Sequence, residues 1–297
     1  MKRGRTVVVV DDLSNGRLEN LEPVKKDVVF VNHDVSRDLS GLLEVNGVSE
    51  IFHLACFPRQ ISFQNPQRDA EVNLVSTVNC LELARRNGAK LLFTSNTGIV
   101  SDPLSLPVDE SFRPSPSTPY DCHKLASEYL LSAYHRMYGV PTVVVRFASI
   151  YGPRQRVNPA LGWRPVIPEF VTKLLRSEAP TITGDGGQTR DFLFVRDAVD
   201  GVIRAMESKA PEANSGGMFI LGTNTETSVK DLFCKIQAIV GNDPTVLPRH
   251  GPMKKDDITR MRYDYSKAKN SFGFQPATDL DRGLAETVEF LRRDAVG

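Results

Sequence analysis

The first half of the chain alternates short runs of β-branched residues with longer helical patterns. The first run, Thr6–Val10, has no polar alternation, which is typical of a strand buried on both faces of a parallel sheet. Similar runs follow at Val28–Val31, Ile51–Leu54, Leu91–Thr94 and Thr142–Val145. This β-α-β-α rhythm predicts an α/β fold, in which helices cover both faces of a doubly wound parallel sheet.

Two long helices are predicted between these runs. Pro66 to Asn87 has apolar residues at roughly helical spacing, and Gly88 supplies the C-terminal stop. Tyr120 to Tyr138 is the second, and Leu39–Val45 has a weaker helical spacing.

The second half is richer in proline and glycine and predicts a smaller α+β lobe. It mixes short strands (Phe192–Val195, Met218–Leu221) with helices (Pro168–Arg176, Val229–Val240, Arg282–Arg293). With 297 residues, two lobes are expected. We place them at 1–152 and 153–297, with a strand and helix near 191–222 returning to the first.

Composition excludes several classes of protein. The net charge of +1 gives no support for a non-specific nucleic-acid binder. The four cysteines form no CxxC pair, so neither a metal site nor a disulfide framework is expected. The chain contains no apolar stretch long enough for a transmembrane helix and no signal-peptide pattern at its start. These features favour a cytoplasmic protein with reduced thiols.

Two acidic residues follow predicted strands. Asp11 stands at the carboxyl tip of the first strand, on the side of an open sheet where ligands bind. There it can accept hydrogen bonds from both hydroxyls of an adenosine ribose and repel a 2′-phosphate, which favours NAD over NADP. A turn acid that caps a short helix is the alternative. Asp34 follows the next strand and could bind the adenine amino group.

Tyr120 and Lys124 form a YxxxK pair at the start of a predicted helix. Four residues are about one helical turn, so both side chains project from one face. A nearby ammonium favours phenolate and should lower the pKa of the tyrosine. Tyr120 is thus a candidate base, although this short pattern also occurs by chance. Hydroxyls at the end of the preceding strand, Phe93–Thr97, could bind the same substrate oxygen.

A glycine-rich turn at 184–187 leads to Arg190 and a short strand. The guanidinium fork suits a diphosphate. The alternative is a hairpin with a surface arginine.

Six segments occur in the order typical of one known family: Asp11-Asp12-Leu13-Ser14-Asn15-Gly16, Phe52-His53-Leu54-Ala55, the pair Tyr120 and Lys124, Tyr151-Gly152-Pro153-Arg154-Gln155, Gly184–Phe192 and Ser266-Lys267-Ala268. From about Thr6 to the C-terminus the chain resembles the extended short-chain dehydrogenase/reductase family, in particular its nucleotide-sugar epimerases, dehydratases and decarboxylases. The resemblance implies a Rossmann domain with tightly held NAD and a C-terminal lobe that binds a nucleoside diphosphate sugar, such as a UDP-sugar.

The resemblance also implies roles for individual residues. Chemistry starts with oxidation at sugar C4 by hydride transfer, with Tyr120 as base and Lys124 as its electrostatic partner, which also holds the nicotinamide ribose. Coenzyme contacts are expected from Asp11, Asp12, Ser14, Asn15, Gly16, Asp34, Val35, Leu54, Ala55, Tyr120 and Lys124. Substrate contacts are expected from Ser95, Ser149, Arg190 and Lys254. The two long helices would suit the four-helix dimer interface common in this family.

The chain departs from the family pattern in the loop after the fourth strand. The Ser or Thr that bridges the sugar hydroxyl and the tyrosine falls on Asn96, with Thr97 as a substitute if the loop shifts. An amide can hydrogen-bond a hydroxyl but cannot relay a proton as a hydroxyl can. Dehydratases carry an Asp-Glu pair just after this position, and decarboxylases a Glu. Here Thr97 and Gly98 follow, which favours epimerase chemistry.

Two further departures lie in the substrate lobe. Ser149 replaces the usual asparagine, where hexuronate 4-epimerases often have threonine, and this points toward a UDP-uronate. Lys254 takes the place of a second diphosphate arginine, which keeps the charge but loses the bidentate fork.

The largest departure is at the front, because the family's first strand, GxxGxxG loop and first helix are absent. In a sheet of order 3-2-1-4-5-6, the strand at Thr6–Val10 and the strand at Ile51–Leu54 would then flank an empty position. We therefore expect this chain to bind NAD weakly, as the product of a start codon placed too late or as a fragment.

The sequence supports two classes of function. The first is an NAD-dependent nucleotide-sugar 4-epimerase, with a 4,6-dehydratase or a decarboxylase as the alternative enzyme. The second is a catalytically silent paralogue that binds a nucleotide sugar without turnover. Intact Tyr120 and Lys124 favour the enzyme, whereas Asn96 and the absent glycine loop favour the paralogue.

Overall fold

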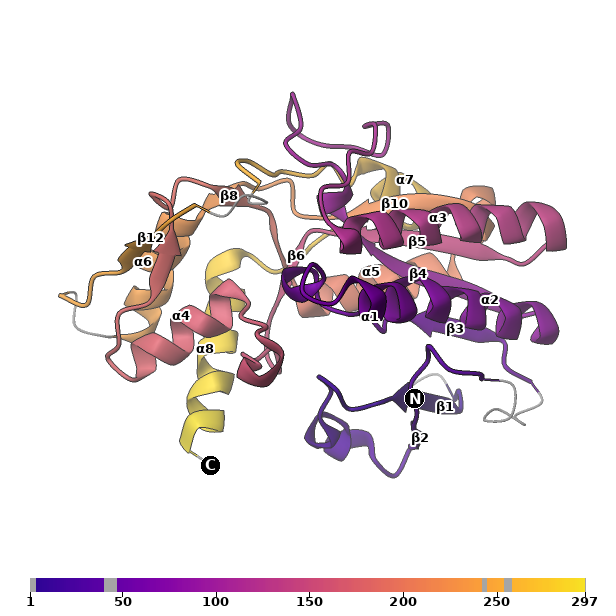
Figure 1. The fold of residues 1–297 in the computed structure, drawn as a ribbon, viewed down its shortest axis with the longest axis horizontal. Helices are drawn as coiled ribbons and strands as arrows, with labels where there is room; N and C mark the ends of the chain where they lie inside the picture. The colour runs from indigo at the N-terminus through magenta and orange to yellow at the C-terminus, as the bar shows by residue number, and fades with distance from the viewer. Residues whose placement is uncertain (1–3, 40–46, 242–244, 254–257, 297) are drawn as a thin grey trace.

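The computed structural model describes residues 4–39, 47–241, 245–253 and 258–296 (Figure 1). Its centre is a four-stranded parallel sheet in the order β10-β5-β4-β3. The strands are β3 (Glu50–His53), β4 (Lys90–Asn96), β5 (Thr142–Phe147) and β10 (Ser215–Leu221). All four were predicted from the sequence, and the α/β Rossmann-type fold class is confirmed.

Strand β1 (Val7–Asp11) pairs in parallel with β2 (Val28–Asn32), and the two form a separate sheet. In the part of the chain that the structure describes, no backbone pairing joins β1 to β3, and Figure 1 shows β1 and β2 set apart from β3. Every residue of β1 is part-exposed. The prediction of a strand is confirmed, but the prediction of full burial is wrong, because β1 stands at an open sheet edge.

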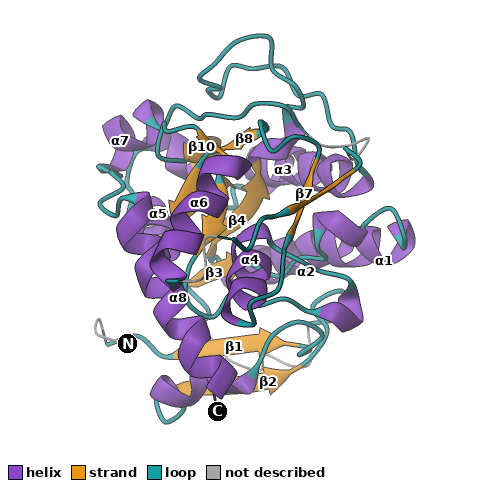
Figure 2. Cartoon of the chain, turned by 90° about the vertical axis from the view of Figure 1, so that its left-hand side faces the viewer, coloured by secondary structure: helices purple, strands orange, loops and turns teal. Residues whose placement is uncertain are grey.

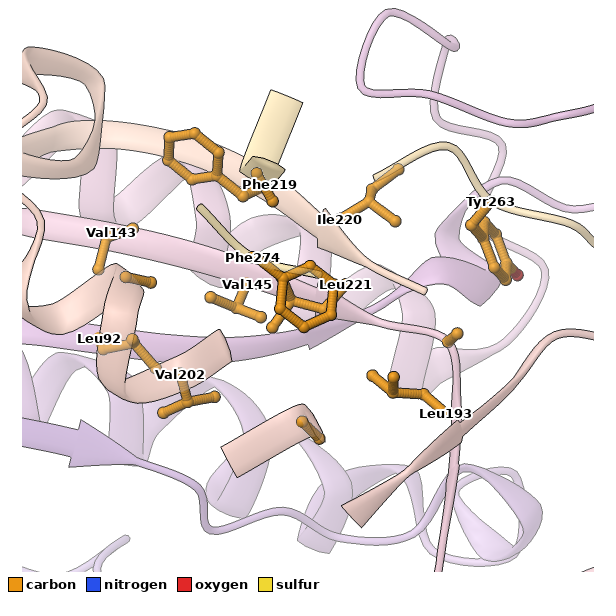
Figure 3. Close-up of a cluster of buried hydrophobic side chains, with 14 of the residues drawn as sticks. Leu92, Val143, Val145, Leu193, Val202, Phe219, Ile220, Leu221, Tyr263 and Phe274 are labelled. Atoms are coloured by element: carbon orange, nitrogen blue, oxygen red, sulfur yellow. The ribbon is translucent and has the colours of Figure 1, made fainter. Parts of the chain in front are cut away.

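Helices cover both faces of the main sheet. Alternate residues of β4 point to opposite sides, as the two-residue period of a strand requires. Leu91 and Phe93 join the apolar cluster beneath α2 (Ser76–Asn87) and α3 (Pro119–Tyr138). Leu92 joins the cluster on the other side, with Val202 of α5 (Val195–Glu207), as Figure 3 shows. Both faces are therefore buried, as in a doubly wound fold.

The predicted helix from Pro66 to Asn87 is present but contains an irregular turn. It runs as α1 (Pro66–Ala70), one π-helical turn (Glu71–Val75) and α2. Gly88 ends it with a φ of 64°, a left-handed conformation that glycine adopts without strain. The predicted helix from Tyr120 is α3, which begins one residue earlier.

The second lobe packs three helices around an apolar core (Figure 2). These are α4 (Val166–Leu175), α6 (Val229–Val240) and α8 (Leu280–Val296), at or near their predicted positions. Three short strand pairs lie outside the main sheet: β6 (Ser149–Tyr151) with β9 (Phe192–Phe194), β7 (Thr181–Thr183) with β12 (Arg249–Gly251), and β8 (Thr189–Arg190) with β11 (Thr227–Ser228).

The chain returns to the first lobe through α5 and β10, and α7 (Ser266–Phe272) packs against β10. The predicted helix at Leu39–Val45 lies almost entirely outside the described residues. Among the residues that the structure places, no helix is both long enough and apolar enough to cross a membrane.

Candidate active site

The segment from Cys56 to Gln60 contributes residues to the walls of two cavities. The first, here called the Asp11 cavity, measures about 500 Å³. All the coenzyme contacts predicted outside α3 line it: Asp11, Asp12, Ser14, Asn15, Gly16, Asp34, Val35, Leu54 and Ala55. The second, the Arg190 cavity, measures about 490 Å³ and is lined by Ser149 and Arg190. The fourth predicted substrate residue, Lys254, lies outside the described residues.

The loop after β1 holds the Asp11 carboxylate at the wall of its cavity. Asp11 Oδ1 accepts a hydrogen bond from the backbone N–H of Leu13 at 2.7 Å. Gly16 lies directly against this carboxylate, since a Cβ added to Gly16 would stand 2.6 Å from Oδ1. Steric fit thus explains the Asp-x-x-x-x-Gly spacing, because any side chain at position 16 would collide with the Asp11 carboxylate.

An arginine that the sequence did not reveal neutralises the acids of this cavity. Arg68, from α1, donates to Asp34 Oδ2 at 2.8 Å and contacts Asp12 Oδ2 at 3.5 Å. Burial alone would raise the pKa of Asp34, but hydrogen bonds from Ser36 and the ion pair with Arg68 outweigh it, and the pKa is lowered. Asp34 is therefore a charged acceptor near neutral pH.

Tyr120 and Lys124 lie in the first turns of α3, as predicted. Thr118 caps this helix by accepting a hydrogen bond from the backbone N–H of Asp121. Lys124 is only 1% exposed, and its ammonium donates to the backbone carbonyl of Thr94 at 3.0 Å. The Lys124 nitrogen lies 5.7 Å from the centre of the Tyr120 ring. The helix therefore brings the phenol and the ammonium together over the end of β4.

The pKa of Tyr120 moves in the direction opposite to the one expected. Burial raises it well above its ordinary value, and the negative charge of Asp121 adds to this effect. Burial also lowers the pKa of Lys124. The expectation that Lys124 alone lowers the pKa of the phenol is wrong for the isolated chain, because desolvation penalises both charged forms. Ionisation of Tyr120 is therefore disfavoured in the isolated chain.

The two candidates for the sugar-hydroxyl contact, Asn96 and Thr97, differ in their hydrogen bonds. Thr97 Oγ1 donates to the carbonyl of Phe147 at 2.9 Å, so its proton is engaged away from the site. Asn96 Nδ2 is buried and has no hydrogen-bond partner in the structure, and the hydroxyl of Ser95 is in the same state. Buried polar groups are seldom left unpaired. Asn96 and Ser95 therefore have unused hydrogen-bonding capacity at the end of β4, and neither residue lines one of the two cavities.

The segment from Cys56 to Gln60 is held in place by residues that the sequence analysis did not single out. Asn73, in the π turn, clamps Phe57 by two hydrogen bonds of 3.1 Å, one to its N–H and one to its carbonyl. Arg59 binds both carboxylate oxygens of Asp121 at 3.2 Å. The π turn thus positions the loop, and Arg59 neutralises the acid next to Tyr120.

Arg190 is held rigidly at the second cavity. Its Nη1 donates to the carbonyls of Thr189 at 2.7 Å and Ile258 at 2.6 Å. The adjacent Asp191 is buried and accepts hydrogen bonds from the backbone N–H groups of Thr223 and Asn224. These contacts fix the strand that carries Arg190 and present an oriented cation to the Arg190 cavity.

The sequence matches the model of the NAD dependent epimerase/dehydratase family over residues 1–222. The chain belongs to this family. The match covers most of the chain. The protein is therefore an enzyme of the kind that modifies nucleotide sugars, and its coenzyme is NAD.

Relatives of more than one activity resemble this chain. It is 38% identical to a UDP-glucose 4-epimerase of Mycolicibacterium smegmatis over 97% of this chain and 91% of the relative. The structure is similar to that of a Thermotoga maritima UDP-glucose 4-epimerase solved with UDP-glucose, with a TM-score of 0.91, 32% identity and coverage of 99% and 93%. A dTDP-glucose 4,6-dehydratase of Streptomyces venezuelae, solved with NAD, gives a TM-score of 0.89, 27% identity and coverage of 98% and 88%. Fold similarity therefore does not separate epimerase from dehydratase.

The described residues fit the adenosine part of NAD, because Asp11 and Asp34 offer acceptors on the wall of the Asp11 cavity. Tyr120 and Lys124 line neither this cavity nor the Arg190 cavity. No glycine-rich turn from a strand to a helix N-terminus lines the Asp11 cavity among the described residues, so backbone donors of that kind for the pyrophosphate are not seen there.

Proposed function

We propose that this protein is a nucleotide-sugar 4-epimerase that acts by transient oxidation at C4. The loop after β4 supports this proposal, because Ser95–Gly98 carries hydroxyls and an amide but no carboxyl group. Elimination and decarboxylation rely in this family on an acid at that loop. The carboxyl group near it, Asp121, is bound by Arg59 and by the Thr118 hydroxyl at 2.7 Å. Epimerisation needs only oxidation, rotation of the ketone and re-reduction.

Tyr120 is the base in this proposal. As phenolate it accepts the proton from the C4 hydroxyl and becomes the phenol, and Lys124 lies near enough to stabilise the phenolate. When bound, NAD supplies the hydride acceptor and the positive charge of the oxidised nicotinamide. Burial disfavours the phenolate in the isolated chain, and positive charge near the ring, such as that of Lys124, favours it.

Asn96 holds the sugar oxygen. Its unpartnered Nδ2 donates a hydrogen bond and orients the C4 hydroxyl toward Tyr120 but carries no proton to it, so Tyr120 must take the proton directly. Ser95 offers a second contact to the sugar. Arg190 binds the diphosphate, with Ser149 beside it on the wall of the same cavity.

We further propose a homodimer in the cytoplasm, with the coenzyme in lobe 1–152 and the nucleotide sugar in lobe 153–297. Helix α3 exposes three large side chains, Tyr129 (65%), Met137 (74%) and Tyr138 (58%). Such exposed apolar groups on one helix favour a protein interface. The four cysteines carry free thiols, which is consistent with a reducing compartment.

Product analysis tests the proposed reaction. The protein is incubated with millimolar NAD and, separately, UDP-glucose, UDP-glucuronate or dTDP-glucose, and products are identified by NMR. The proposal predicts a C4 epimer of at least one UDP-sugar. A 4-keto-6-deoxy sugar would instead establish a dehydratase, and released carbon dioxide a decarboxylase. Binding of a UDP-sugar with no product would support the silent paralogue.

A further inference from the structure

One buried carboxyl group near Tyr120 and Lys124 has no part in the reaction proposed above. Asp69, from α1, is fully buried. Its Oδ1 accepts a hydrogen bond from Asn73 Nδ2 at 2.6 Å, and its Oδ2 lies 2.5 Å from Nδ1 of His123. A buried carboxyl group without partners would be costly, and these contacts offset that cost. Asp69 and His123 therefore form a hydrogen-bonded pair, here called the Asp69–His123 pair, that joins α1 to α3.

The position of His123 gives this pair access to both the site and the solvent. His123 lies in α3, three residues after Tyr120 and one residue before Lys124. Residues three apart are neighbours on the surface of a helix. The side chain of His123 is 22% exposed, whereas that of Asp69 is shielded from water. Protons from solvent can therefore reach the partner of the buried carboxyl group.

The charge of Asp69 acts on both residues of the YxxxK pair. Burial has the largest effect on their pKa values, raising that of Tyr120 and lowering that of Lys124. The negative charge of Asp69 raises the pKa of both. A protonated His123 cancels most of this charge, whereas a neutral His123 leaves it facing the phenol. The proton on His123 thus decides whether this negative charge opposes formation of the phenolate.

Two other acids act on Tyr120 or Lys124, and each is bound by an arginine. Arg59 binds both carboxylate oxygens of Asp121 at 3.2 Å. Arg146 of β5 binds Glu128 at 2.6 Å. Arginine stays protonated in proteins, whereas histidine changes charge near neutral pH, so only the Asp69–His123 pair combines an acid with a titrating partner. The charged and titratable groups that surround Tyr120 and Lys124 are thus Asp121, His123 and Glu128 of α3, Asp69 of α1, and Cys56 and Arg59 of the segment from Cys56 to Gln60.

We propose that Asp69 and His123 are positioning residues that set the charge facing the Tyr120 base, with the proton on His123 as the variable. The proposal rests on the proposed function, in which Tyr120 is the base. Asp69 also orients the amide of Asn73. Because Nδ2 of this amide faces Asp69, its Oδ1 is left to accept the backbone N–H of Phe57 at 3.1 Å.

The first test is the pH profile of kcat/KM at saturating NAD. Asp69→Asn removes the negative charge, and His123→Asn keeps an amide nitrogen near Nδ1 but leaves the Asp69 charge uncompensated. The acid limb of the His123→Asn profile should lie about half to one pH unit above that of Asp69→Asn, with the native limb between them. The double variant should return to the Asp69→Asn limb. A merely structural pair would lower kcat in both variants and leave the limbs together.

The second test needs no turnover, because it follows Lys124 by NMR of lysine labelled with ¹³C at Cε. Asp69→Asn should lower the titration midpoint of Lys124 by about half to one pH unit, because it removes a nearby negative charge. Between about pH 5 and 8, where histidines change charge, the native Lys124 signal should show a step that is absent from His123→Asn. Lys90 of β4, whose pKa burial lowers to about 8, is the internal control and should not move.

Several results would overturn the proposal. These are coincident acid limbs in the two single variants, a double variant that stays with His123→Asn, an unmoved Lys124 midpoint in Asp69→Asn, or an equal movement of Lys90. A step in the Lys124 signal that survives in His123→Asn would refute the role of the His123 proton. Absence of turnover in every form, together with the expected Lys124 results, would refute the proposed function and leave the action of the Asp69–His123 pair standing.

Discussion

His53 makes the stability of this fold sensitive to acid. It ends β3, is 3% exposed, and its Nε2 lies 3.0 Å from the Ser76 hydroxyl and 3.2 Å from the Thr77 hydroxyl. Burial, with a smaller contribution from the Lys124 charge, lowers its pKa from 6.5 to about 3. The folded state therefore keeps this ring neutral through the range in which the unfolded chain protonates it.

The sign and size of the effect follow from linkage. The folded pKa lies below the unfolded one, so the contribution to stability is complete above pH 6.5 and is lost as the pH falls toward 3. Each pH unit below 6.5 costs about 1.4 kcal/mol. At pH 5 the loss from His53 is thus about 2 kcal/mol relative to pH 8. Substituting His53→Gln keeps a polar side chain of similar reach but removes the titration.

Urea unfolding at pH 8, 6.5 and 5 measures the difference between the native protein and the Gln variant. Comparing the two cancels the titration of the carboxylates. Between pH 8 and pH 5, we expect the free energy of unfolding to fall by about 2 kcal/mol less in the variant than in the native protein. His250→Gln, at an exposed position, is the control for the substitution itself. Parallel pH profiles for native protein and His53→Gln would refute the assignment of a buried neutral ring.

Three substitutions test the site. Tyr120→Phe should reduce turnover by about 10²–10⁴-fold with folding unchanged by circular dichroism, and near-native turnover would contradict its role as base. Arg190→Ala should weaken UDP-sugar binding by about ten- to a hundredfold in calorimetry while leaving NAD binding unchanged, and equal weakening of both ligands would contradict the division into lobes. Gly16→Ala should weaken NAD binding and leave UDP-sugar binding unchanged, because the added Cβ would stand 2.6 Å from the Asp11 carboxylate. Unchanged NAD affinity would mean that the adenosine binds elsewhere.

Much of the fold was readable from the sequence because its signals are local. Runs of β-branched residues gave the strands of the main sheet, and Gly88 gave a helix end. The exposure of β1 was not visible in its valines, because burial depends on what lies beside a strand. The π turn at Glu71–Val75 was also missed, and so was the tertiary contact that Asn73 in this turn makes with Phe57.

The site was predicted where a motif fixes the geometry. Asp11 and Gly16 lie in one loop at the Asp11 cavity, and Tyr120 and Lys124 lie in the first turns of α3, as their spacings predict. Arg68 and Arg59 were missed because each meets its acid from a distant part of the chain. The direction of the Tyr120 pKa was wrong because spacing gives proximity to Lys124 but not the desolvation of both groups.

The central claim, oxidation and re-reduction at C4, is tested most directly with a UDP-sugar that carries deuterium at C4. The protein is supplied with millimolar NAD in ordinary water, and the C4 epimer is isolated and examined by NMR and mass spectrometry. The account predicts that the epimer keeps deuterium at C4, because the same coenzyme removes and returns it. An epimer that has exchanged this deuterium for a solvent proton would contradict the account.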